Sequence, residues 1–412
     1  TRGSEGFETC GADLETDAFK CVVEWLTGDR VAYTDKENNI AIKADWSNGK
    51  VGMTGRSYGG TTDFSVAATG VKGLETIVPV AGIASWYEYT NSQGISTGRN
   101  PAYSDDLAFY CAGRYIDDAD YAAIAEDYGN YLGQIRDDQL ALNGDYGGHW
   151  ANRDYTTADG KIDGYNNFSC PALIVHGLND DNVRTKQFEL MYHAFQDAGQ
   201  NVKLLLHQGA HITPDYDSHK TSLPIGRASY NGILNKWFSH YLYGQDNGAE
   251  DMAAVTVQSN VDGSWTTLDQ WESSGELTLA CAAEQDATTI HSDIASIGVT
   301  SRNWKDKFTA GSTGASAMYT MDVAADTTIQ GAAAVHSKAA PTQYYTASAE
   351  APADEAPAAE APRGSDHEEI MNPANRTGEM ADVPMLFTIA GPLERFDDVV
   401  RACVIDQEFH PE

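Results

Sequence analysis

The run Gly55-Arg56-Ser57-Tyr58-Gly59 could activate a serine for attack on a carbonyl carbon. It fits the pattern G-x-S-x-G, in which the serine stands on a sharp turn between a strand and a helix. A match arises by chance in about one chain in seven, so the motif alone decides little. Its neighbours support it, because residues 51–54 are strand-like and Thr61 begins a helical pattern. We predict that Ser57 is a nucleophile and that the backbone N–H of Tyr58 stabilises an oxyanion.

A serine hydroxyl needs a base, and that base needs a third group to orient it. In the hydrolase chain order both follow the serine, each on a loop after a later strand. The strand-like run 172–176 is followed by Asp180 and Asp181, and the run 202–207 is followed by His211. The sequence therefore offers an acid and a base in the expected places.

Spacing alone leaves the acid open between Asp180 and Asp181. For the base, His211 is preferred because it lies past the strand end, whereas His207 fits a structural residue within the strand. Each candidate also has a structural interpretation, Asp180 as a turn residue and His211 as a hydrogen-bonded loop histidine. The order of serine, acid and base in one chain favours catalysis over three separate coincidences.

The elements that must position these residues are short apolar strands alternating with helices. Such continuous apolar runs are typical of a parallel sheet that is buried on both faces. We expect strands at 50–54, 78–81, 172–176 and 202–207, and helices at 17–26, 60–68, 185–198 and 227–243. An acidic insertion near residues 100–165, with its Ala- and Tyr-rich centre at 117–145, is expected to cap the site.

The pattern changes after about residue 250. Short alternating segments, such as residues 254–258 and 277–280, indicate an antiparallel β domain. An Ala/Pro/Glu stretch near residues 347–370 cannot build a core, and we expect it to be disordered. We therefore predict one domain over residues 1–247 and a second over 248–412.

Composition excludes several classes of function. The net charge of -33 makes nucleic-acid binding improbable, because phosphates would be repelled. This acidity suits either a solvated surface or a cationic ligand such as a peptide amine. No apolar run reaches the ~20 residues of a membrane span. The six cysteines are scattered without a C-x-x-C pair, which indicates free thiols in a reducing compartment rather than a zinc site, with disulfides as the alternative. We expect no metal and no cofactor.

Several motifs together resemble the Xaa-Pro dipeptidyl-peptidases of bacteria. The resemblance runs from about Thr1 to Tyr243 and weakens over the β domain. The related cocaine-esterase-like and α-amino acid ester hydrolases share this arrangement of the triad. The motifs are Gly55-Arg56-Ser57-Tyr58-Gly59-Gly60-Thr61, Ala81-Gly82-Ile83-Ala84-Ser85-Trp86-Tyr87-Glu88-Tyr89, His176-Gly177-Leu178-Asn179-Asp180 and Gly209-Ala210-His211-Ile212.

The resemblance implies an α/β-hydrolase domain followed by a jelly-roll-like β-sandwich. It implies removal of a dipeptide whose second residue is proline, from peptides with a free N-terminus, and it selects Asp180 as the acid. It makes Trp86 and Tyr89 walls of the proline pocket, in place of ordinary core residues. It assigns the other side of that pocket to Asn182 and Val183.

The resemblance also gives Asp105 a role in binding the substrate amine. The family usually has Glu at this position, so the shorter side chain changes the reach of the contact. The opening residues resemble a loop after a mid-sheet strand. We therefore expect earlier strands, and a tyrosine that supplies the second oxyanion donor, upstream of Thr1. A cytoplasmic location is expected, with secretion as the alternative, and a homodimer is left open.

Two other functions remain as alternatives. An ester or α-amino acid ester hydrolase could use the same scaffold and the same triad. A non-catalytic protein could instead bind carbohydrate through its β domain, with the hydrolase site idle. The ordered triad argues against this last alternative.

Overall fold

The computed structural model describes residues 8–35, 37–92, 95–96, 103–113, 119–142, 144–156, 167–214, 229–272 and 298. All statements below concern this part of the chain.

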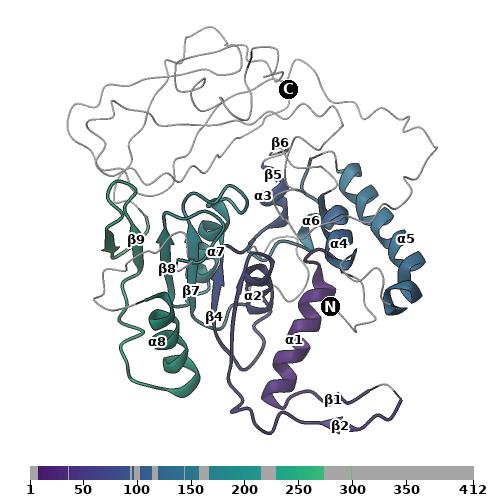
Figure 1. The fold of residues 1–412 in the computed structure, drawn as a ribbon, viewed down its shortest axis with the longest axis horizontal. Coiled ribbons are helices and arrows are strands. Elements are labelled where there is room, and N and C mark those ends of the chain that lie inside the picture. Colours follow the sequence, from purple (N-terminus) through teal and green to yellow (C-terminus); the bar gives the residue numbers. More distant parts are fainter. Residues whose placement is uncertain are drawn as a thin grey trace.

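A six-stranded sheet forms the centre of the described structure, in the order β10-β9-β8-β7-β4-β3 (Figure 1). Neighbouring strands are parallel from β3 to β9, and only β10 is antiparallel to its partner. This mostly parallel sheet with helices on both faces is an α/β fold, consistent with the predicted hydrolase class. The strands are β3 (Val51–Arg56), β4 (Leu74–Val80), β7 (Ala172–Gly177), β8 (Val202–His207), β9 (Val255–Gln258) and β10 (Trp265–Leu268).

Helices cover both faces of this sheet. No helix in the described ranges is both long enough and apolar enough to cross a membrane. Two short strand pairs and one isolated bridge lie outside the sheet in the described residues. The pairs are β1 (Ala32–Tyr33) with β2 (Ala41–Ile42), and β5 (Asn91–Ser92) with β6 (Ile95–Ser96), and the bridge joins Ser85 to Asp154. The helices are α1 (Asp13–Thr27), α2 (Tyr58–Ala68), α3 (Trp86–Thr90), α4 (Tyr103–Gly113), α5 (Ala119–Ala141), α6 (Gly148–Ala151), α7 (Lys186–Asp197) and α8 (Tyr230–Tyr243).

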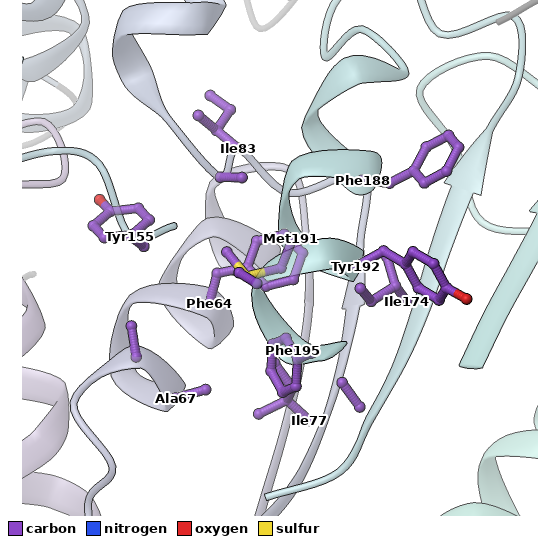
Figure 2. Packing of buried hydrophobic residues seen from close by; sticks show 14 of the residues in the cluster. Phe64, Ala67, Ile77, Ile83, Tyr155, Ile174, Phe188, Met191, Tyr192 and Phe195 are labelled. Carbon is purple, nitrogen blue, oxygen red and sulfur yellow. The ribbon is translucent and has the colours of Figure 1, made fainter. Parts of the chain in front are cut away.

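The larger hydrophobic core lies between the sheet and the helices α2 and α7. Figure 2 shows Phe64 of α2 beside Met191 and Phe195 of α7, over Ile77 and Ile174 of the sheet. All five side chains are at most 1% exposed. Because successive side chains of a strand point to opposite faces, the strand residues next to Ile77 and Ile174 face the other side of the sheet and belong to a second core.

That second core lies under α8. Leu173, Val175 and Leu205 of the sheet pack against Ile233 and Trp237 of this helix. The two cores explain why β4, β7 and β8 read as continuous apolar runs, since nearly every residue of these strands is buried. β3 is only partly buried.

The predicted insertion near residues 100–165 contains α4, α5 and α6, which lie between β4 and β7 in the chain. Its role as a cap stays a prediction. Figure 1 shows α4, α5 and α6 gathered beside α3 and close to the start of α1. The rings of Tyr103 at the start of α4 and Tyr89 in α3 are 5.5 Å apart. The insertion is thus joined to the segment that follows β4.

The assignment of residues 254–258 to an antiparallel β domain is wrong. Residues 255–258 form β9, which is parallel to β8 and belongs to the main sheet. The alternation of Thr256 and Gln258 with valines suggested a strand with one wet face, but all four residues of β9 are buried. The sheet therefore continues past the predicted boundary at residue 247. Residues 277–280 and the stretch near 347–370 lie outside the described residues.

Close backbone contacts at glycines hold α2 against the ends of β3 and β4. A Cβ atom at Gly55 would lie 2.6 Å from the backbone carbon of Gly59. One at Gly60 would lie 2.8 Å from the carbonyl oxygen of Val80, and one at Gly82 would lie 2.6 Å from the backbone carbon of Gly60. A Cβ at Gly59, in contrast, would have no atom within 4 Å.

The two glycines of the motif should therefore differ in their tolerance of alanine. Gly55→Ala should destabilise the protein by about 1–3 kcal/mol, because its Cβ would push against backbone. Gly59→Ala should cost nothing and could gain up to about 1 kcal/mol, because alanine favours a helix. Urea unfolding of both variants measures the difference. Equal losses at the two positions would contradict this account of the turn.

Candidate active site

Ser57 occupies the turn between β3 and α2 in a strained conformation. Its φ of 59° and ψ of -123° lie in a region that non-glycine residues rarely adopt. Such a conformation costs about 1–3 kcal/mol and persists only where the surroundings enforce it. Here Ser57 N donates to Val80 O at 2.9 Å, and Ser57 O accepts from Thr61 N at 2.9 Å. The predicted strand–turn–helix setting is thus present.

The amide of Tyr58 lies at the start of α2, as the sequence suggested. The first N–H groups of a helix have no acceptor within the helix. The Tyr58 N–H, next to Ser57, is therefore one of the groups whose dipole favours negative charge.

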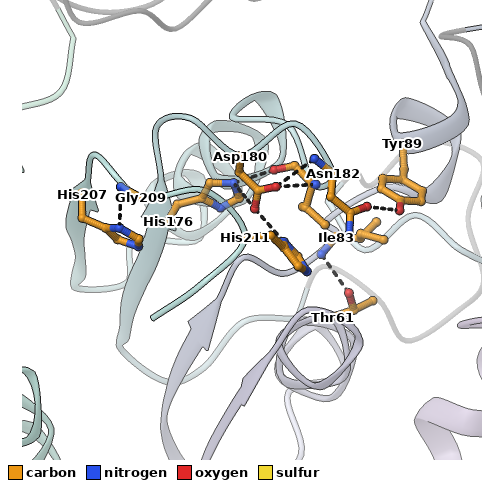
Figure 3. A network of polar contacts seen from close by, with 10 residues as sticks. Thr61, Ile83, Tyr89, His176, Asp180, Asn182, His207, Gly209 and His211 are labelled. Carbon is orange, nitrogen blue, oxygen red and sulfur yellow. Dashed lines mark hydrogen bonds and ion pairs between the residues drawn. The ribbon is translucent and has the colours of Figure 1, made fainter. Parts of the chain in front are cut away.

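The loops after β7 and β8 bring Asp180 and His211 together (Figure 3). His211 Nδ1 lies 2.7 Å from Asp180 Oδ2. Asp180 is 6% exposed, whereas Asp181 is exposed to solvent and has no part in this pair. His207 is fully buried at the end of β8, and its Nδ1 accepts from Gly209 N at 3.1 Å. Of the two aspartates that spacing left open, Asp180 is the one that pairs with His211.

The second oxygen of Asp180 shapes its own loop. Asp180 Oδ1 accepts hydrogen bonds from the backbone N–H groups of Asn182 and Val183, both at 2.9 Å. A buried carboxylate needs such donors, because an unpaired buried charge is costly. With Oδ2 facing His211, both oxygens are engaged.

The pairing with Asp180 fixes the tautomer of His211. A carboxylate only accepts hydrogen bonds, so the proton of a neutral imidazole sits on Nδ1. His211 Nε2 is then the acceptor nitrogen. It is buried and has no hydrogen-bond partner among the described residues. The ring is poised to receive a proton at Nε2.

His176 is a supporting residue that we did not single out from the sequence. Its Nε2 donates to Val183 O at 2.8 Å and lies 3.8 Å from Asp180 Oδ2. Burial lowers the pKa of His176 below its ordinary value, so the ring stays neutral. Its place four residues before Asp180 in the motif was the available signal.

The four predicted pocket residues lie beside this acid loop. Tyr89 OH donates to Asn182 Oδ1 at 2.6 Å, which joins α3 to the loop after β7 (Figure 3). The rings of Trp86 and Tyr89 are 5.7 Å apart and meet edge to face. Trp86 and Val183 are at most 1% exposed, and Tyr89 is 5% exposed. Core packing also accounts for these side chains, so the role in a pocket stays a prediction.

Asp105 is engaged by an arginine that sequence reasoning missed. Arg136 of α5 contacts Asp105 Oδ2 through Nη2 at 2.6 Å and through Nε at 2.8 Å. Asp105 Oδ1 is buried without a hydrogen-bond partner among the described residues. Burial raises the pKa of Asp105, and the charge of Arg136 opposes this shift. No local pattern links the two residues, because they are 31 positions apart.

Known proteins resemble this chain over the part that carries the site. The family profile described as X-Pro dipeptidyl-peptidase (S15 family) matches residues 1–213. The chain is 41% identical over 278 residues to the Xaa-Pro dipeptidyl-peptidase of Ligilactobacillus salivarius, which covers 66% of this chain and 33% of that protein. It is 36% identical over 276 residues to the enzyme of the same name from Lactobacillus helveticus, covering 66% and 32%.

The chain thus spans about a third of the length of the curated relatives it matches. Among solved structures, a CocE/NonD family hydrolase from Staphylococcus aureus aligns with a TM-score of 0.45 and 16% identity, over 66% of this chain and 40% of that one. An α-amino acid ester hydrolase aligns with a TM-score of 0.35 and 17% identity, over 61% and 41%.

The profile covers more than half of the 412 residues, from Thr1 past Ser57, Asp180 and His211. The chain belongs to the X-Pro dipeptidyl-peptidase (S15) family.

Proposed function

We propose that the protein is a serine peptidase that removes Xaa-Pro dipeptides from the N-terminus of peptides. The observation that carries this proposal is the pair of Asp180 and His211 at 2.7 Å, with Nε2 unpartnered, on the same sheet edge as the strained Ser57. Relatives that share this part of the chain are named Xaa-Pro dipeptidyl-peptidases.

In this mechanism the Oγ of Ser57 attacks the carbonyl carbon of the proline residue, and His211 Nε2 takes the hydroxyl proton. The carbonyl oxygen gains negative charge and accepts from the Tyr58 N–H. When the C–N bond breaks, His211 returns the proton to the leaving amine. Water then attacks the acyl-enzyme with His211 as base again, and the dipeptide acid leaves. The hydrogen bond from Ser57 Oγ to His211 Nε2 that the first step needs is of the type that tightens when substrate binds.

Asp180 supports both steps without giving up its charge. It keeps the His211 proton on Nδ1 and stabilises the imidazolium that forms during each transfer. In this proposal Trp86, Tyr89, Asn182 and Val183 form the pocket for the proline ring beside it. A proline ring lacks an N–H and packs well on aromatic faces, which matches this lining.

The function is tested with matched substrates. Ser57→Ala should lose at least about 10³-fold in kcat on an Xaa-Pro p-nitroanilide, because the triad acts as a unit. The wild type should hydrolyse this substrate well and the corresponding Xaa-Ala amide poorly. Labelling of wild type, and not of Ser57→Ala, by a fluorophosphonate checks the nucleophile. A wild type that hydrolyses simple esters but no Xaa-Pro amide would contradict the peptidase assignment.

The acid is tested by two neighbouring carboxylates. Asp180→Asn should lower kcat by up to about 10⁴-fold, because the amide holds the wrong imidazole tautomer. Asp181→Asn should change kcat less than about twofold, because this side chain is exposed and has no contact with His211. Steady-state kinetics of both variants decide the assignment. A larger loss in Asp181→Asn would reverse it.

A second candidate is an ester hydrolase that needs no free amine. The pair of Arg136 and Asp105 favours it, because a carboxylate already held by a guanidinium attracts an ammonium less strongly. Asp105 Oδ1 nevertheless remains without a partner. This oxygen is the group we propose for the substrate amine in the peptidase.

Acetylation of the substrate amine separates the two candidates. If Asp105 binds the amine, acetylation should cost the wild type at least about tenfold in kcat/KM. The cost should shrink in Asp105→Asn and grow in Arg136→Gln, which frees the carboxylate. Asp138→Asn, at an exposed position of α5, is the control and should keep the wild-type ratio. Equal rates on free and acetylated substrates in the wild type would favour the ester hydrolase.

A further inference from the structure

A carboxylate in the first turn of α1 is tied to the residue that follows the nucleophile. Glu15 Oε2 accepts from Tyr58 OH at 2.5 Å and from Gly11 N at 3.1 Å. Glu15 Oε1 accepts from Thr9 Oγ1 at 2.7 Å and from Thr9 N. Each oxygen thus has two donors, which fills the acceptor sites of a carboxylate.

These bonds fix a loop that packs under the aromatic residues. Cys10 and Gly11 both have positive φ, 53° and 79°, so the loop adopts a turn that needs outside support. Gly11 O accepts from Tyr155 OH at 2.5 Å, and Tyr155 OH accepts from Trp86 Nε1 at 3.1 Å. A Cβ atom at Gly11 would lie 2.2 Å from Trp86 Nε1. The loop and Trp86 are therefore in direct contact.

Arginine holds the same loop from the other side. Arg153 Nη2 donates to Thr9 O at 2.8 Å, and Arg153 Nε donates to Cys10 O at 3.0 Å. The rings of Tyr58 and Trp86 are 5.4 Å apart. Glu15 is therefore bonded directly to Tyr58 and is linked to Trp86 through the loop at Gly11.

The hydrogen bonds around Tyr58 need one more proton than its hydroxyl group supplies. Tyr58 OH lies 2.9 Å from Glu8 Oε1 as well as 2.5 Å from Glu15 Oε2. A phenol carries one proton and can donate only once. Both contacts can be hydrogen bonds if one of the two carboxyl groups is protonated. Glu15 already accepts from Thr9 N, Thr9 Oγ1 and Gly11 N, so the proton fits Glu8, which then donates to Tyr58 Oη while Tyr58 donates to Glu15.

The surroundings of Glu8 favour that proton. Burial, followed by the charge of Glu15, raises the pKa of Glu8 to about 7. Tyr128 OH of α5 donates to Glu8 O at 3.2 Å. Burial also raises the pKa values of Tyr58, Tyr128 and Cys10, so these groups stay neutral at pH 7. The guanidinium of Arg153, which binds the same loop, stays charged throughout.

We propose that Glu15 is a positioning residue for the Tyr58 amide and for Trp86. A proton on Glu8 completes the hydrogen bonds that fix the Tyr58 side chain to Glu15. This inference rests on the proposed function, because it assigns the Tyr58 amide to the oxyanion. Displacement of such a donor by about 1 Å can cost about 10²-fold in rate. The cluster therefore acts on turnover from behind the site, without contact with substrate.

The sign of the pH dependence follows from the raised pKa. The folded protein keeps the Glu8 proton up to about pH 7, whereas the unfolded chain releases it near the ordinary value of 4.5. The Glu8–Tyr58–Glu15 hydrogen bonds, and the stability that they contribute, are fully present below the ordinary Glu8 pKa of 4.5. Both are lost as pH rises through about 7. Glu8→Gln cannot lose a proton and keeps a donor for Tyr58 Oη, so it should be insensitive over this range.

The experiment measures the rate at which a fluorophosphonate modifies Ser57, from about pH 5 to about pH 9. In the wild type the rate should decline through the alkaline half of this range. Glu8→Gln should remove that decline and keep the acid limb, which the general base sets. Glu15→Gln should be slower by at least about tenfold at every pH, because an amide cannot accept from all four donors. Asp17→Asn, at an exposed position of α1, is the control and should follow the wild type.

Thermal unfolding provides a readout that needs no activity. The midpoint of Glu8→Gln should rise relative to that of the wild type as pH increases from about 5 to about 9. If Glu15→Gln does not fold, the pH profiles and midpoints of Glu8→Gln decide. An unchanged alkaline limb in Glu8→Gln, or a rate within about twofold of wild type in folded Glu15→Gln, would overturn the proposal.

The reagent keeps the two proposals distinguishable. The phosphonate reports acylation of Ser57 and needs no Xaa-Pro specificity. A wild type that reacts with it but does not cleave Xaa-Pro amides would contradict the substrate and leave the Glu15 test intact. A folded wild type that does not react at all would contradict both.

Discussion

The buried carboxylate of Asp180 is the interaction on which the site depends. It is desolvated, so its oxygens need donors, and the loop after β7 supplies two backbone N–H groups while His211 supplies a third. Those same backbone bonds place Asn182 where Tyr89 can donate to it. The orientation of the base and the position of the aromatic segment thus follow from the solvation of one side chain.

Much of the sheet was predictable because its central strands β4, β7 and β8 are buried on both faces. The run 202–207 matches β8, and the run 172–176 matches all but the last residue of β7. The prediction failed at β9, where two polar residues are buried. Gln258 has internal partners, since its Oε1 accepts from Gln208 N at 2.9 Å. A polar residue with a buried partner looks like a surface residue in the sequence, so alternation gave the wrong type of strand.

The candidate site was predictable to the extent that chain order reflects strand order. Ser57, Asp180 and His211 each follow a strand, and parallel strands bring their carboxyl ends to one edge of a sheet. Contacts that depend on side-chain reach across the fold had no such signal. Arg136 and Asp105 belong to different helices, and Tyr58 meets Glu15 from 43 positions away. Only the folded chain reveals these pairs, because no periodicity connects their positions.

The place of β9 next to β8 has a consequence for synthesis of the protein on the ribosome. The chain emerges from its N-terminus, so β3, α2 and β4 are available early, whereas β8 remains an open edge until residue 258 has been made. Exposed strand edges on nascent or partly folded chains promote mispairing and aggregation. The edge of β8 beside the loop that carries His211 is therefore covered by β9 only late in translation. Expression fragments that end at residue 247 would remove a strand from the interior of the sheet rather than a separate module.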